Sequence, residues 1–162
     1  MFVATPISPA TMTDPQPTAG YSGTPLPKKL GIKPGHRIRL LGAPADFART
    51  LGELPEAVRV VSGDGDGDRL DLVLFFTASA DALRARFDGL SASLVPAGML
   101  WVAWPKRASR VPTDLTENAV RAIALERGMV DVKVCAIDAT WSGLKLVYRL
   151  ADRPKLKRGW RG

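Results

Sequence analysis

The last two strands that the sequence predicts are too close together in the chain to lie parallel. Residues 132–137 and 144–150 are apolar stretches typical of strands, and only the six residues 138–143 separate them. A parallel pair needs a crossover of about a dozen residues or more, so these two strands must form an antiparallel hairpin. Any fold assigned to this chain therefore has to end in such a hairpin.

The chain before this hairpin alternates between strand and helix patterns. Strands are predicted at residues 38–41, 58–61, 71–76 and 99–104, and helices at 45–52, about 80–94 and 114–127. This alternation indicates an α/β fold with three layers, in which helices cover both faces of a mostly parallel sheet of about six strands. Residues 71–76 form a continuous apolar run, which is typical of a central parallel strand buried on both faces.

Apolar spacing predicts where the second of these helices ends. Ser79 can cap it, and Leu83, Phe87, Leu90 and Leu94 recur at the spacing of one helical face. The Pro-Ala-Gly sequence that follows should end the helix. Leu94 is therefore expected to be its last buried side chain.

Composition divides the chain into three parts. Residues 1–20 are rich in Pro and Thr and should be disordered, with Met1 or Met12 as the start of translation. A single α/β domain is expected over 21–150, its first fifteen residues forming an ordered arm. A basic tail, 151–162, follows. The net charge of +7 lies in the ends, because basic and acidic residues balance within 37–148.

The scarcity of cysteine and histidine excludes several kinds of chemistry. Cys135 is the only cysteine and His36 the only histidine, so neither a disulfide, a zinc site nor a catalytic triad is expected. The acidic run 64–68 fits the start of a calcium loop, but Arg69 and Phe75 stand where that loop needs Gly and Glu. No metal or organic cofactor is predicted. Without a leader or a long apolar run, a cytoplasmic protein without membrane contact is expected.

A sheet that closes with an antiparallel hairpin resembles the methyltransferase variant of the Rossmann fold. Residues 94–102, LVPAGMLWV, also resemble a turn that precedes a late strand in that superfamily. The resemblance implies strand order 2-1-3-4-6-5, with one strand–helix unit missing before residue 71. It also implies a glycine-rich turn after the first strand, where this chain has only Gly42, and an acid near the second strand, where Asp64 stands.

Three segments resemble a bacterial family of unknown function. They are GYSGTPL to GIK in residues 20–33, WVAWPK to TDLTE in 101–117, and KVCA to TWSGL in 133–144. This resemblance implies a small bacterial cytosolic protein and brings no activity with it.

The junction after the strand at 99–104 is the best candidate for a ligand site, because open α/β sheets bind ligands outside the carboxyl ends of their strands. Asp114 and Glu117 resemble a capping box, whose helix N–H groups could support an anion. The predicted site for a small anionic ligand consists of Gly42, Thr77, Lys106, Arg107, Ser109, Thr113 and Trp141, the last in the hairpin turn. In the alternative interpretation, Thr113 and Asp114 merely cap a helix and the two bases are solvated.

The sequence favours a binding module over an enzyme. One alternative is an adaptor for nucleic acid or an acidic partner that uses the basic tail, through Arg153, Lys155, Lys157, Arg158, Trp160 and Arg161. Another is a degenerate protein that binds adenosylmethionine. A third is an enzyme with Lys106 and Asp114 as its acid–base pair, although nothing in the sequence names a substrate.

Overall fold

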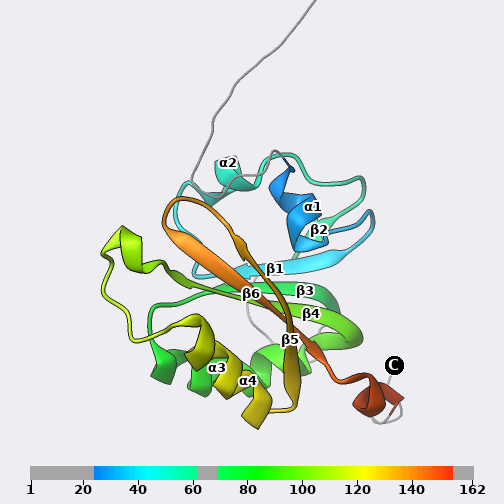
Figure 1. The fold of residues 1–162 in the computed structure, drawn as a ribbon. Coiled ribbons are helices and arrows are strands. Elements are labelled where there is room, and N and C mark those ends of the chain that lie inside the picture. The colour runs from blue at the N-terminus through cyan, green and yellow to red at the C-terminus, as the bar shows by residue number, and fades with distance from the viewer. Residues whose placement is uncertain (1–23, 62–68, 155–162) are drawn as a thin grey trace, which may run out of the picture.

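Six strands form one mixed sheet in the computed structural model, which describes residues 24–61 and 69–154 (Figure 1). The strands are β1 (Arg37–Leu41), β2 (Arg59–Val60), β3 (Leu70–Phe76), β4 (Leu94–Pro105), β5 (Met129–Ala136) and β6 (Trp141–Tyr148). Their order is β2-β1-β3-β4-β6-β5. The first four strands run parallel, and β6 is antiparallel to both of its neighbours, as the short separation from β5 predicted.

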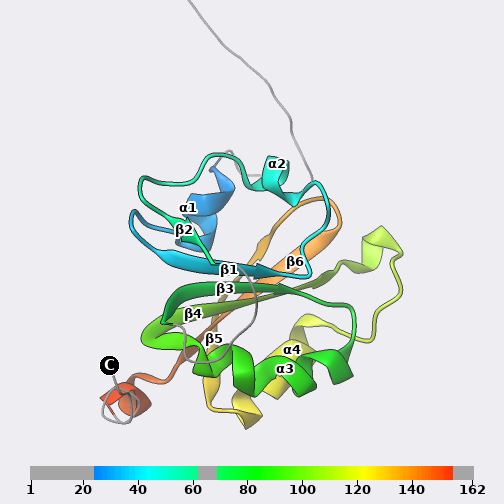
Figure 2. The same ribbon diagram turned by 180° about the vertical axis from the view of Figure 1, so that it is seen from behind.

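Helices cover both faces of the sheet, which confirms the predicted three layers (Figures 1 and 2). The single-turn helices α1 (Leu26–Leu30) and α2 (Phe47–Leu51) lie on one face, and α3 (Ala80–Ala92) and α4 (Glu117–Glu126) lie on the other. Within the described ranges, no helix combines the length and the apolar character needed to span a bilayer.

The core between the sheet and the pair α3–α4 follows the apolar spacing of the sequence. Leu83, Phe87 and Leu90 of α3 are buried there with Val120 and Ile123 of α4. Strand β3 is buried on both faces, because its alternate side chains enter the two cores on either side of the sheet.

The core on the opposite face includes apolar residues of the arm that precedes β1, and it holds this arm against the sheet. Leu26, Leu30 and Ile32 are buried against the sheet. The indole Nε1 of Trp101 donates a hydrogen bond of 2.9 Å to the carbonyl oxygen of Leu30, and Trp101 itself is fully buried. This hydrogen bond holds a helix of only one turn, which would not be stable alone, against β4.

Several boundaries differ from the sequence-based predictions, and two of these differences change the setting of a named residue. Leu94 is not the last turn of α3 but the first residue of β4, since Ser93 ends the helix and its carbonyl oxygen accepts from the N–H of Leu70. The pairing of β3 with β4 then shifts register, so that the proline after Leu94 lies in an irregularity that absorbs its missing N–H. Trp141 is not in the hairpin turn but begins β6, paired with Pro105.

Residues 1–20, for which disorder was predicted, lie outside the described residues. The basic tail is described only as far as residue 154, through the short 3-10 helix Leu150–Asp152.

Candidate functional site

The loops at the carboxyl edge of the parallel strands bring the predicted site residues to one end of the sheet. Gly42 follows β1, Thr77 follows β3 and Lys106 follows β4. The N–H of Thr77 donates to Ala103 at 3.0 Å, and the N–H of Lys106 donates to Thr140 at 2.7 Å. These hydrogen bonds tie the loops to the neighbouring strand and to the β5–β6 turn, respectively.

Gly42 lies in the turn after β1, close to the end of the neighbouring strand β3. Its φ of +70° favours glycine, and a Cβ atom there would lie 2.6 Å from the carbonyl oxygen of Phe76. The turn after β1 therefore approaches the end of β3 closely. The one glycine of this turn serves a contact within the protein.

Three aromatic rings fill the same end of the sheet on the α2 side. The ring of Phe76 packs edge-on against Phe47 at a centroid distance of 4.9 Å and against Trp141 at 5.1 Å. Both phenylalanines are buried. Trp141 thus belongs to a packed cluster, which leaves its indole ring only partly exposed.

Hydrogen bonds within the loop after β4 engage its hydroxyl groups. Ser109 Oγ donates to the carbonyl oxygen of Lys106 at 2.6 Å within the 3-10 helix η2 (Arg107–Ser109). Thr113 Oγ1 donates to the carbonyl oxygen of Ala78 at 2.7 Å and accepts from Leu115 N–H. Both hydroxyls that were predicted to bind an anion therefore already have hydrogen-bond partners within the protein.

Asp114 caps a different helix from the one predicted. Its Oδ1 accepts from the N–H of Ala80 at 2.8 Å, at the start of α3. Thr116 is the N-cap of α4, where its Oγ1 accepts from Ala119 at 3.1 Å. The capping-box prediction for Asp114 is wrong, because adjacent β3 and β4 bring their two loops into contact.

The structure describes the basic side chains of this loop but only one of those predicted in the tail. Arg107 is exposed and Lys106 half-buried, and neither has an ion pair within residues 24–61 and 69–154. In the tail, Arg153 Nε donates to the carbonyl oxygen of Tyr148 at 3.2 Å. The other predicted tail residues, Lys155, Lys157, Arg158, Trp160 and Arg161, lie outside the described residues.

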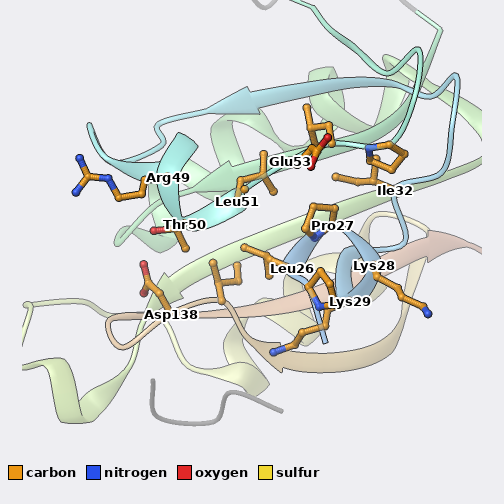
Figure 3. A pocket seen from close by; sticks show the side chains of 15 residues that line it. Leu26, Pro27, Lys28, Lys29, Ile32, Arg49, Thr50, Leu51, Glu53 and Asp138 are labelled. Atoms are coloured by element: carbon orange, nitrogen blue, oxygen red, sulfur yellow. The ribbon is translucent and has the colours of Figure 1, made fainter. Parts of the chain in front are cut away.

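A cavity of about 880 Å³ lies between α1 and α2 and reaches the β5–β6 turn (Figure 3). Its walls are largely apolar and include Leu26, Pro27, Ile32, Leu51, Leu54 and Ile137. Its size and its apolar lining are those of a small-molecule site.

Six polar or charged side chains border this cavity, and the basic ones among them are Lys28, Lys29 and Arg49. Thr50 of α2 and Asp138 of the β5–β6 turn lie together at one end, and Glu53 lies toward the other (Figure 3). Asp138 Oδ1 accepts two backbone N–H bonds of 2.8 Å, from Thr140 and Trp141, which fix this carboxylate in place. A ligand in the cavity would meet a fixed acceptor beside a hydroxyl at one end.

None of the cavity residues was predicted from the sequence. The cavity depends on two single-turn helices that pack beside each other and on a turn more than eighty residues away. No local motif signals such an arrangement. Among the described residues, no cluster of three or more His, Cys, Asp or Glu side chains could hold a metal ion.

Solved structures of methyltransferases share this fold. A putative type 11 methyltransferase from Sulfolobus solfataricus has a TM-score of 0.56 at 13% identity, over 76% of this chain and 89% of that one. A SAM-dependent methyltransferase from Aquifex aeolicus has a TM-score of 0.55 at 16% identity, over 74% and 85%. No family model and no curated protein matches the chain. At such identities the likeness shows the fold alone, a methyltransferase-like Rossmann fold.

At the carboxyl edge, the described residues of the turn after β1 and of the end of β3 pack closely against one another. There Gly42 lies close to the backbone of Phe76, and the Phe76 ring packs edge-on against Phe47 and Trp141. Asp64, the acid suggested for a ribose, lies outside the described residues. The cavity between α1 and α2 is therefore the better candidate for a ligand site.

Proposed function

We propose that this chain uses a degenerate methyltransferase-like fold to bind a small molecule in the cavity between α1 and α2. The cavity itself carries the proposal, because it combines an apolar wall with polar groups at its ends. The close packing of Gly42 and Trp141 against Phe76 is the reason to place the ligand in this cavity and not at the carboxyl edge.

The lining favours a ligand of nucleoside size that has an apolar ring and a hydrogen-bond donor. The ring would lie against Leu26, Leu51 and Ile137, which gain by excluding water. A ligand hydroxyl or ammonium would donate to the carboxylate of Asp138 beside the Thr50 hydroxyl. Adenosylmethionine and adenosylhomocysteine, which have both features, are the first ligands to test.

A thermal-shift and calorimetric titration tests this proposal. The probes are adenosylmethionine, adenosylhomocysteine, adenosine and a sugar phosphate. A ligand at about a hundred times its dissociation constant should add about 2.7 kcal/mol to the free energy of unfolding. Thr50→Trp, which fills the cavity from α2, should abolish the response. Asp138→Asn, which keeps an acceptor for the two backbone N–H groups, should weaken it.

Variants at the sheet edge provide the control. Lys106→Ala and Arg107→Ala should leave the titration unchanged, because both lie in the loop after β4 and not in the cavity lining. A response that disappears in these two variants and survives in Thr50→Trp would place the ligand at the carboxyl edge. That result, or no response to any probe, would overturn the proposal.

A further inference from the structure

Lysines gather on the α1 side of the hairpin formed by β5 and β6. Lys133 and Lys145 are direct partners in the β5–β6 ladder, and Lys145 is also the partner of Trp101 on β4. Because the buried indole of Trp101 faces the α1 side, its partner Lys145 and then Lys133 face the same side. Like charges directly opposite each other in a sheet are destabilising.

Lys33 joins this pair from the segment after α1. The Nζ atom of Lys145 lies 4.0 Å from the position of a Cβ on Gly31, at the end of that helix. Lys33 is two residues further along. Burial of Lys145, together with the charges of Lys133 and Lys33, holds the pKa of Lys145 below its usual value.

No carboxylate balances these charges within residues 24–61 and 69–154. Asp131, the acid of β5, lies on the opposite face, 3.0 Å from Arg121 Nε. Neither Lys33, Lys133 nor Lys145 forms an ion pair among the described residues. The groups that act on Lys145 through charge are both lysines.

A merely structural role for Lys145, at the negative end of α1, is a weaker explanation. The carbonyl oxygens of that end already have donors: Lys28 accepts from Gly31, Pro27 accepts from Ile32, and Leu30 accepts from the indole of Trp101. A helix of five residues also has little dipole to offer. Among residues 24–61 and 69–154, the lysine cluster therefore has no counter-charge or cap to explain it.

We propose that Lys33, Lys133 and Lys145 form a binding site for a compact oxyanion, namely the phosphate or diphosphate group of a small molecule. Lysine ammonium groups bind phosphate as point charges. The three residues come from three segments that meet beside one helix end, an arrangement suited to one multivalent group and not to an extended strand. None of these residues lines the cavity, so this inference does not depend on the proposed function.

Inorganic pyrophosphate is the probe for this site. Thermal shift and calorimetry on the full chain at low salt should show a rise in Tm, with chloride at equal ionic strength as the reference. Lys145→Gln and Lys133→Gln should each weaken pyrophosphate binding about tenfold, which corresponds to the loss of one charged hydrogen bond. Lys145→Gln should also raise the Tm of the free protein, because it removes a partly buried charge that faces two others.

Arg59→Gln is the matched control, since it removes one exposed positive charge from β2 at the other edge of the sheet. It should bind pyrophosphate as the unaltered chain does. Equal weakening in all three variants, or no rise in Tm for the unaltered chain, would overturn the proposal. Because Lys133 is exposed, its variant should fold even if Lys145→Gln does not.

A short oligonucleotide distinguishes a small ligand from a polymer. We expect the oligonucleotide to bind no more tightly than pyrophosphate. Its binding should depend only weakly on salt, because three lysines can neutralise at most three phosphates. Tighter binding of the oligonucleotide, with a steep salt dependence that Lys145→Gln reduces, would replace the small ligand by a nucleic-acid backbone.

Discussion

Replacement of Gly42 by alanine should destabilise the protein more than the same change at another glycine with positive φ. Gly42 and Gly128 have φ of +70° and +89°, so alanine is strained at both. Only at Gly42 would the new methyl group meet a neighbour, the carbonyl oxygen of Phe76 at 2.6 Å. Nothing lies within 4 Å of a Cβ at Gly128. The pair therefore separates backbone strain from the close approach of β1 to β3.

The expected magnitudes follow from these two terms. Left-handed backbone costs an alanine about 1–2 kcal/mol, which is the whole effect expected for Gly128→Ala. Overpacking against a rigid neighbour adds about 1–3 kcal/mol, because a backbone carbonyl within a sheet cannot rotate away as a flexible side chain can. Gly42→Ala should therefore lower the free energy of unfolding by about 2–5 kcal/mol.

Urea unfolding of both variants, followed by circular dichroism, measures the difference. The slope of the free energy against urea should be unchanged, so that the midpoints report stability directly. If the two variants lose the same free energy within about 0.5 kcal/mol, the turn after β1 does not press against β3. The close approach of Gly42 to Phe76 would then be refuted.

Three further variants test other contacts. Asp114→Ala should lower the free energy of unfolding by about 1–2 kcal/mol and speed hydrogen exchange at the Ala80 amide, whereas a loss of protection confined to α4 would contradict the assignment. Tyr148→Phe should cost about 1 kcal/mol below pH 10 through the lost bond to Ser91. The raised pKa of Tyr148, due mainly to burial, makes this difference shrink as pH rises beyond 10. The lowered pKa of Lys145, due first to burial, means that the folded protein binds fewer protons, so its stability relative to Lys145→Gln should rise as pH approaches 10.5. A flat difference would refute this.

The topology could be predicted because its main signals are short in range. Six residues between two strands leave no choice but a hairpin, and the apolar run at 71–76 is typical of a central parallel strand. The strand order required the resemblance to a known fold as well, because nothing local specifies which strands become neighbours.

Predictions at element ends failed where tertiary contacts compete with local patterns. Asp114 stands three residues before Glu117, as a capping box requires, yet its partner is the Ala80 amide, 34 residues away. Leu94 continues the apolar spacing of α3, yet it is the first residue of β4, where it pairs with Leu70. In both cases the local pattern is present, and a contact between distant segments decides.

The two binding sites proposed here could not be predicted for a related reason. The cavity joins α1, α2 and the β5–β6 turn, and the lysine cluster joins the end of α1 to the paired strands β5 and β6. Each depends on the arm before β1 lying over the sheet. The sequence signals for that arm, Leu26, Leu30 and Ile32, indicate burial and not what it is buried against.

A shared topology does not carry a shared site, and this chain illustrates the physical reason. Strand order depends on many apolar contacts, so it survives large changes in sequence. A ligand site at the edge of the sheet depends on a few residues, and here one glycine lies against a carbonyl oxygen and three rings, Phe47, Phe76 and Trp141, pack together. On the face that α1 and α2 cover, the situation is different. Each of these helices has a single turn and covers the sheet only partly. The cavity lies between these two short helices, and its size and largely apolar lining are the reason to place the proposed ligand there.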